Sequence, residues 1–327
     1  MPTPGRHLSS TLLVRVLVTI GYTDQFAYPL SAKQVWQRLV SLEDRQGQQR
    51  EPRRWWLPGS YPPELPRRTV RQALDRLEKL GLVSRDQDWY FLAGRSEQVA
   101  VRQERAVSSQ TKRSELDQLI RIVKHLPWIR AVALTGSLAM DNAGPQEDTD
   151  LMIITSPGRL WLARLMVTAV ALLKGKRRSW SGEELGSWCF NLWLDGNHLG
   201  VLIDKRSVYT AYEVIQADFV LSKQLAADAF FEANHWLYRF LPHSSFPGWA
   251  PHSPSLLEVA LTNIDTLLRP VWSGLNAVSY LVQRWYMRPH QTSERVALGY
   301  AYFHPRDTRQ DITDRWRQSL VRLIERR

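Results

Sequence analysis

Apolar residues recur at intervals of three and four positions in three stretches of the N-terminal part of the chain, which is the spacing of one helix face. The first stretch covers residues 12–20. The second follows Ser31, a residue type that often caps a helix N-terminus. The third covers residues 70–80 and is followed by Gly81, where a helix can end in the left-handed conformation. The pattern therefore predicts three helices.

Two short runs of β-prone residues follow the third predicted helix. They cover residues 82–84 and 89–92 and are separated by four polar residues. Three helices followed by a β-hairpin is the order of elements in a winged helix. We therefore expect a winged-helix domain in residues 1–98, with an unusually long connection at residues 42–66 between its second and third helices.

The outer face of the third predicted helix is basic, and in a winged helix this face enters the major groove of DNA. The candidate nucleic-acid contacts on this helix and on the hairpin turn are Arg68, Arg71, Gln72, Arg76, Lys79 and Arg85. Residues 1–130 contain 22 Lys and Arg against 13 Asp and Glu, a net +9 of the total +11. Such an excess favours a polyanionic partner, because counterions released from nucleic acid drive binding. A protein-docking role for the same domain is the alternative.

A second candidate site lies in the run AVALTGSLAMDNAGPQEDTDLMIIT, which covers residues 131–155. Its two ends are apolar and β-prone; Gly136 and Ser137 end the first predicted strand, and Asp148 and Asp150 stand at the start of the second. Because side chains alternate along a strand, these two carboxylates point to the same side. Such a pair can hold the divalent metals of phosphoryl transfer, and Gly136 and Ser137 can donate hydrogen bonds to phosphate oxygens.

This order of strand, Gly-Ser, ten intervening residues and Asp-x-Asp resembles the nucleotidyltransferase fold of the DNA polymerase β superfamily. The resemblance implies a mixed sheet with flanking helices and dependence on Mg²⁺ or Mn²⁺. It also implies that Asp148 and Asp150 are catalytic metal ligands and that Gly136 and Ser137 bind the phosphates of an NTP. The chain is similar to uncharacterised bacterial proteins that join a winged helix to a nucleotidyltransferase domain. That similarity rests on the winged helix and on the runs GSLAM, DTDLMIIT, GRLWLARL, WCFNLWL, YTAYE and AYFHPRD.

The superfamily pattern includes a third carboxylate on a neighbouring strand, and the sequence offers three positions for it. Residues 188–194 and 198–203 predict a hairpin. Asp204 follows its second strand, and we expect it to be the third catalytic and metal-binding carboxylate. Asp195 is the rival, although its place in an Asp-Gly pair is typical of a turn. If Asn191 holds the position instead, a neutral amide replaces a carboxylate and metal binding weakens.

The composition, with 44% hydrophobic and 23% charged residues, is that of a globular protein, and 327 residues suffice for two or three domains. We expect an α/β (α+β) chain with a helical connector that breaks near Ser108-Ser109. The expected divisions are a winged helix at 1–98, the connector at 99–126, a nucleotidyltransferase domain at 127–215 and a C-terminal helical domain at 216–327.

The expected function is the Mg²⁺-dependent transfer of NMP from an NTP to a nucleic-acid or protein acceptor. The alternative is a DNA-binding regulator whose nucleotidyltransferase domain senses a nucleotide without turning it over. The single cysteine, Cys189, excludes an intramolecular disulfide and agrees with a reducing compartment. The most apolar run, residues 160–173, is shorter than the ~20 residues that span a bilayer. We therefore expect a cytoplasmic protein with no membrane partner.

Overall fold

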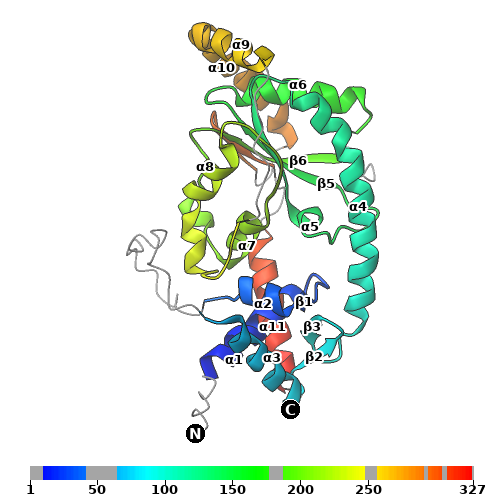
Figure 1. The fold of residues 1–327 in the computed structure, drawn as a ribbon. Coiled ribbons are helices and arrows are strands. Elements are labelled where there is room, and N and C mark those ends of the chain that lie inside the picture. The colour runs from blue at the N-terminus through cyan, green and yellow to red at the C-terminus, as the bar shows by residue number, and fades with distance from the viewer. Residues whose placement is uncertain are drawn as a thin grey trace.

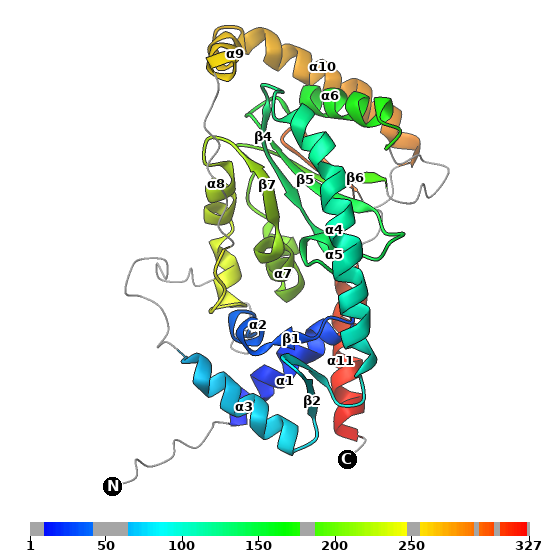
Figure 2. The same ribbon diagram turned by 45° about the vertical axis from the view of Figure 1, so that its right-hand side comes forward.

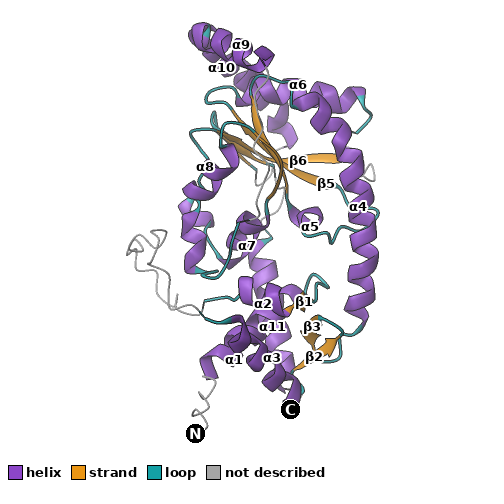
Figure 3. Cartoon of the chain, in the orientation of Figure 1, coloured by secondary structure: helices purple, strands orange, loops and turns teal. Residues whose placement is uncertain are grey.

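The computed structural model describes residues 10–41, 65–176, 187–246, 256–290, 294–303 and 308–325. It is a mixed α/β structure with two sheets, a small one near the N-terminus and a larger one in the centre of the chain (Figure 1, Figure 3). The long connection predicted at residues 42–66 lies almost entirely outside the described residues.

The small sheet and three helices form residues 10–92, which we call the N-terminal unit. Its elements are α1 (Ser10–Asp24), β1 (Leu30–Ser31), α2 (Ala32–Gln37), α3 (Arg67–Lys79), β2 (Val83–Asp86) and β3 (Trp89–Leu92). The strands are antiparallel in the order β1-β3-β2. Ser31 caps α2 as expected, since its side chain accepts a hydrogen bond from the Gln34 backbone N–H at 3.3 Å. The three predicted helices and the two predicted strands are present.

A single long helix, α4 (Glu97–Val123), leads from the N-terminal unit to the central sheet and runs along one side of the molecule (Figure 2). The break that we expected near Ser108-Ser109 is absent. Ser109 is buried, and its hydroxyl accepts a hydrogen bond from the Ala143 backbone N–H at 3.0 Å. A tertiary contact thus satisfies the polar side chain that was expected to interrupt the helix.

Six strands form the central sheet in the order β7-β4-β5-β6-β9-β8. They are β4 (Ile129–Leu134), β5 (Thr149–Thr155), β6 (Trp188–Asp195), β7 (Asp218–Ser222), β8 (Arg295–Val296) and β9 (Tyr300–Tyr302). β5 and β6 are parallel, whereas the other neighbouring strands are antiparallel. The sheet is therefore mixed.

Both faces of the central sheet are buried, because alternate residues of its strands enter two separate apolar clusters. On one face, Val132 and Leu151 pack with α4 and α6 (Leu160–Leu173). On the other face, Ala133 and Met152 pack with α7 (Val208–Gln216) and α8 (Ala226–Ala233). The even-numbered side chains of β5 therefore point toward α7.

The C-terminal region differs from the separate helical domain predicted for residues 216–327. β7, β8 and β9 belong to the central sheet, and the chain after β7 continues as α8 and the 3-10 helix η2 (His235–Arg239). The remaining helices are α9 (Leu256–Leu267), α10 (Arg269–Met287) and α11 (Arg309–Glu325). α9 and α10 lie at one end of the molecule and α11 lies on the N-terminal unit at the other end (Figure 1). There the Trp316 indole donates a hydrogen bond to the Val18 carbonyl at 3.0 Å.

The hairpin predicted at residues 188–203 is not formed either. β6 covers its first strand, but the neighbours of β6 in the sheet are β5 and β9. Residues 203–205 form a short 3-10 helix, η1 (Ile203–Lys205), and residues 198–202 contain no strand. None of the described helices combines the length and the apolar character needed to cross a bilayer.

Candidate active site

The two predicted metal-binding carboxylates lie where β5 begins. Asp148 immediately precedes the strand, and Asp150 points to the α7 side of the sheet, as Met152 does. The Ser187 hydroxyl donates a hydrogen bond to Asp148 Oδ1 at 2.8 Å, and the Asn191 side-chain amide donates one to Asp150 Oδ1. Neutral donors from β6 and from the residue just before it therefore orient both carboxylates.

Gly136 begins the short helix α5 (Gly136–Ala139) directly against this acidic pair. Its φ is +61°, a conformation that strains any residue with a Cβ. A Cβ placed at this position would lie 2.7 Å from Asp150 Oδ2, well inside van der Waals contact. The Thr135 backbone N–H also donates a hydrogen bond to the Asp150 carbonyl at 3.0 Å. The turn thus lies directly against the Asp150 carboxylate, and position 136 has room only for glycine.

Gly136→Ala is expected to lower both stability and any nucleotide affinity of the site. The left-handed backbone alone costs about 1–2 kcal/mol, and the contact with Asp150 adds to it. Gly175→Ala is the matched control, because Gly175 has a φ of +62° but a methyl group added there would meet nothing within 4 Å. Thermal unfolding should show a larger loss for Gly136→Ala than for Gly175→Ala. Equal losses would mean that Asp150 does not constrain position 136.

Ser137 follows in the same turn and contacts a neighbour of the acidic pair. Its hydroxyl donates a hydrogen bond to Glu147 Oε2 at 2.5 Å. Glu147 directly precedes Asp148 in the chain. The structure therefore places Gly136 against Asp150, and Ser137 against Glu147, the residue before Asp148.

The side chain that contacts Asp150 from the neighbouring strand is that of Asn191. Asp150 pairs with Cys189 and Met152 pairs with Leu192 across the parallel strands, with an irregularity between them that leaves an extra residue on β6. Asn191 lies in that irregularity, and its amide oxygen accepts a hydrogen bond from the Cys189 thiol at 2.7 Å. The alternative that placed an amide beside the acidic pair thus matches the observed geometry.

Asp204, the expected third carboxylate, lies elsewhere. It belongs to η1, its side chain is 56% exposed, and it pairs with Arg295 of β8 at 2.8 Å. That hydrogen bond holds the pKa of Asp204 below its usual value. β8 is the edge strand three positions from β5, so the structure does not bring Asp204 to the pair. Asp195 is at the opposite end of β6, where it accepts hydrogen bonds from the backbone N–H groups of Asn197 and Gly158.

A carboxylate that sequence reasoning missed comes from α7. Glu213 is half-buried on α7, and its neighbours Tyr212 and Val214 belong to the apolar cluster on this face of the central sheet. Burial, followed by repulsion from Asp150, raises the pKa of Glu213 to about 7. The signal that could have identified it is that Glu213 is the one charged residue of the segment 208–216.

The raised pKa of Glu213 predicts a pH-dependent stability. Between pH 4.5 and about 7 the folded chain keeps a proton that the unfolded chain releases, so the free energy of unfolding falls as the pH rises. Glu213→Gln should remove this loss and make the variant more stable than the natural chain at pH 8, by up to about 3 kcal/mol. The two proteins should converge near pH 4. Urea unfolding at both pH values measures the difference, and a constant difference would contradict the assignment.

The N-terminal unit docks beside this site. The Tyr22 ring of α1 stacks on the Tyr212 ring at 4.1 Å, and the Tyr212 hydroxyl donates a hydrogen bond to the Arg38 carbonyl at 2.8 Å. The Asn142 side-chain amide, six residues after Gly136, donates to the Phe26 carbonyl at 3.0 Å. Both the loop that follows the Gly-Ser turn and the helix that carries Glu213 are therefore in contact with the N-terminal unit.

The predicted nucleic-acid contacts lie on the far side of the N-terminal unit. The exposed residues of α3 include Arg68, Arg71, Gln72, Arg76 and Lys79, together with Arg67, Asp75 and Glu78. Arg85 is exposed near the end of β2, where its side chain donates a hydrogen bond to the Gln87 carbonyl at 2.6 Å. α3 lies at the end of the molecule opposite α9 and α10 (Figure 2).

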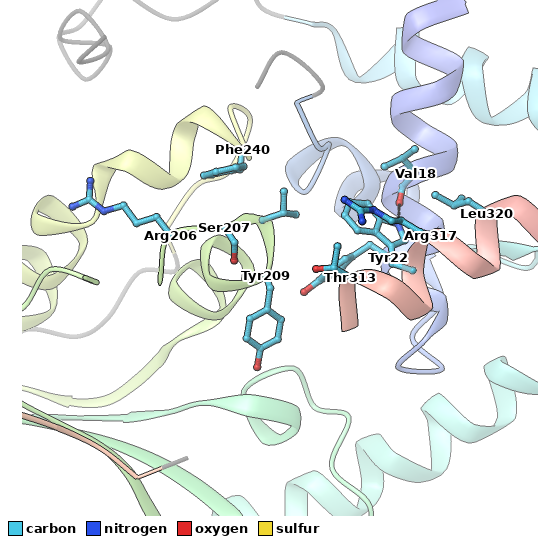
Figure 4. Close-up of a pocket in the computed structure, with 11 residues that line it drawn as sticks. Val18, Tyr22, Arg206, Ser207, Tyr209, Phe240, Thr313, Arg317 and Leu320 are labelled. Atoms are coloured by element: carbon cyan, nitrogen blue, oxygen red, sulfur yellow. Dashed lines mark hydrogen bonds between the residues drawn. The ribbon is translucent and has the colours of Figure 1, made fainter. Parts of the chain in front are cut away.

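A cavity of about 390 Å³ lies where α1, α7 and α11 meet (Figure 4). Its walls are mainly apolar and aromatic and include Tyr22, Phe240 and Trp316. Arg206 extends away from the other labelled side chains in the close-up, whereas Arg317 lies beside Tyr22. Its described lining includes none of the residues predicted to bind metal, phosphate or nucleic acid.

The described residues contain no group of three His, Cys, Asp or Glu side chains gathered closely enough to hold a metal ion. Comparisons with family models, with curated proteins and with solved structures found no match to the chain.

Proposed function

We propose that the central sheet binds a nucleoside triphosphate with a divalent metal and transfers its nucleotidyl group to an acceptor, and that the N-terminal unit acts as a winged helix that contacts nucleic acid. The observation that carries the proposal is the packing of the Gly136 backbone against the Asp150 carboxylate. The turn would bind the phosphates and the two carboxylates would bind the metal of one metal–nucleotide complex.

The donor set suits Mg²⁺ or Mn²⁺. The Asp148 and Asp150 carboxylates are hard oxygen ligands, and Asn191 can add its amide oxygen if the amide turns over. The missing side chain at Gly136 lets the turn approach Asp150 Oδ2 closely. When bound, the metal would neutralise phosphate charge and stabilise the attacking and leaving oxygens.

The residues of the chain supply positioning and proton transfer. Ser187 and Asn191 orient the two carboxylates, and the backbone N–H groups of Gly136 and Ser137 donate to phosphate oxygens. Glu213 takes the proton of the acceptor hydroxyl as its oxygen attacks the α-phosphorus and pyrophosphate leaves. A pKa of about 7 suits a general base at neutral pH.

A second candidate function is a regulator that binds the nucleotide and changes the nucleic-acid affinity of the N-terminal unit. Asn191 favours it, because an amide beside Asp150 holds a metal less well than a carboxylate. The contacts of Asn142 with Phe26 and of Arg38 with Met140, at 3.0 and 3.1 Å, join the loop after the Gly-Ser turn to the N-terminal unit. Ordering of this loop by a nucleotide would therefore act directly on that unit.

Incubation of the full chain with each α-labelled NTP, Mg²⁺ and nucleic acid or cell lysate separates the two functions. A nucleotidyltransferase is expected to move label into a macromolecule and to lose this activity in Glu213→Gln. A regulator is expected to return the NTP unchanged while its nucleic-acid affinity shifts. Asn191→Asp is expected to raise metal affinity in either case.

A further inference from the structure

Helix α10 has an inverted distribution of polar and apolar side chains. Its polar residues Asn276, Ser279 and Gln283 are between 1 and 7% exposed and face α6. Asn276 accepts a hydrogen bond from the Trp161 backbone N–H at 2.9 Å, and Gln283 donates one to the Trp161 carbonyl at 2.8 Å. These contacts fix which face of α10 is turned inward.

The outward face of the same helix is apolar. Its exposed residues include Val271 at 56%, Leu275 at 46%, Val278 at 58%, Leu281 at 62%, Val282 at 58% and Trp285 at 76%, and we call these six the α10 stripe. Neighbouring α9 adds Ile264 and Leu267. Together they leave several hundred Å² of apolar surface, which is at the upper end for one patch on a monomer and near the ~800 Å² that each partner contributes to a stable interface.

The spacing of the α10 stripe is that of a helix seam. Val271, Leu275, Val278, Val282 and Trp285 are separated by four, three, four and three positions, the intervals of the a and d positions of a heptad. Val278 lies midway between Leu275 and Leu281 and also midway between Val271 and Trp285. A two-fold axis at Val278 would therefore lay the stripe of one copy on that of another, with the helices antiparallel.

Gly274 leaves room in this pairing for a large side chain of the second copy. It lies within the stripe in the middle of α10, where glycine weakens a helix, and a methyl group built on it meets nothing within 4 Å. The interior of the chain therefore does not require glycine there. In the antiparallel pairing the large Trp285 of one copy lies over Val271 and Gly274 of the other, so the widest side chain meets the shallowest part of the stripe.

From the inverted helix and the match between Trp285 and Gly274, we propose that two copies of this chain associate through an antiparallel pairing of the α10 stripes. α10 lies on the outside of α6, at the end of the molecule away from the N-terminal unit (Figure 2). The pairing leaves Asp150 and the basic face of α3 uncovered and places the two N-terminal units at opposite ends of the dimer. The inference does not depend on the proposed function.

Sedimentation equilibrium of the full chain over 1–100 µM tests the pairing. The expected mass is twice the 37.9 kDa of one chain. Gly274→Gln fills the space for Trp285 and should raise the dissociation constant at least tenfold without lowering the thermal stability of the monomer. Leu173→Gln is the control, because Leu173 is 87% exposed on α6 outside the stripe and its replacement should leave the mass unchanged.

Cysteine cross-linking tests the direction of the helices. Val278→Cys should form a disulfide-linked dimer on oxidation, whereas Val271→Cys should not, because the antiparallel pairing separates the two copies of position 271 by about 21 Å along the helix. Cross-linking at both positions would indicate parallel helices and contradict the proposal. A monomer at 100 µM, or an unchanged mass for Gly274→Gln, would also contradict it. A monomer that sediments with vesicles of phosphatidylcholine and phosphatidylserine would contradict it as well and would make the stripe a membrane contact.

Discussion

Asp150→Asn is expected to reduce nucleotidyl transfer by about 10³-fold or more, because the metal that this carboxylate would hold supplies several kcal/mol of charge stabilisation. The fold should survive. The substituted side chain keeps an oxygen that can accept the Asn191 hydrogen bond, and the repulsion between Asp150 and Glu213 disappears. Steady-state turnover of the labelled NTP, together with thermal unfolding in EDTA, measures both effects.

Asp204→Asn is the matched control for this prediction. Asp204 is an exposed aspartate paired with Arg295 on the edge strand, so its replacement should change turnover by no more than about twofold and stability by less than about 1 kcal/mol. Loss of turnover in Asp204→Asn, or full turnover in Asp150→Asn, would contradict the assignment of the acidic site to β5.

The second large effect concerns the basic face of α3. Replacement of both Arg71 and Arg76 with alanine should weaken nucleic-acid binding by the full chain and reduce the slope of log affinity against log salt by about one unit for each lost phosphate contact. Both side chains are exposed, so the fold of the N-terminal unit should be unaffected. Fluorescence anisotropy over a series of salt concentrations gives the slope.

Arg317→Ala serves as the control for charge alone. Arg317 is 75% exposed on α11, away from the α3 face, and its loss changes the net charge without removing a predicted contact. It should leave the slope nearly unchanged. Binding that is undetectable at low salt, or that does not respond to salt, would make the N-terminal unit a protein-docking module.

The sequence predicted the features that depend on short-range patterns. Apolar spacing of three and four residues located α1, α2 and α3, and the Gly-Ser turn and the Asp-x-Asp at the start of β5 appear where expected. Gly136 shows why such a prediction can succeed, because a left-handed turn against a carboxylate restricts the position to one residue type.

The features that depend on contacts between distant segments were not predictable in this way. β6 pairs with β9, which lies more than 100 residues later, and this pairing replaces the local hairpin that we expected to deliver Asp204. The place of Asn191 beside Asp150 follows from the parallel register of β5 and β6 and from its irregularity. Glu213 reaches the same region only because α7 packs across the sheet.

The proposed transfer requires that a nucleotide and a divalent metal bind together at β5, and calorimetric titration tests this requirement most directly. Each of the four NTPs is titrated into the full chain in Mg²⁺ and again in EDTA, with Asp150→Asn measured alongside. The account predicts that at least one NTP binds in Mg²⁺, and that binding is lost in EDTA and in the variant. Binding that is equal in all three conditions, or absent for all four NTPs, would contradict it.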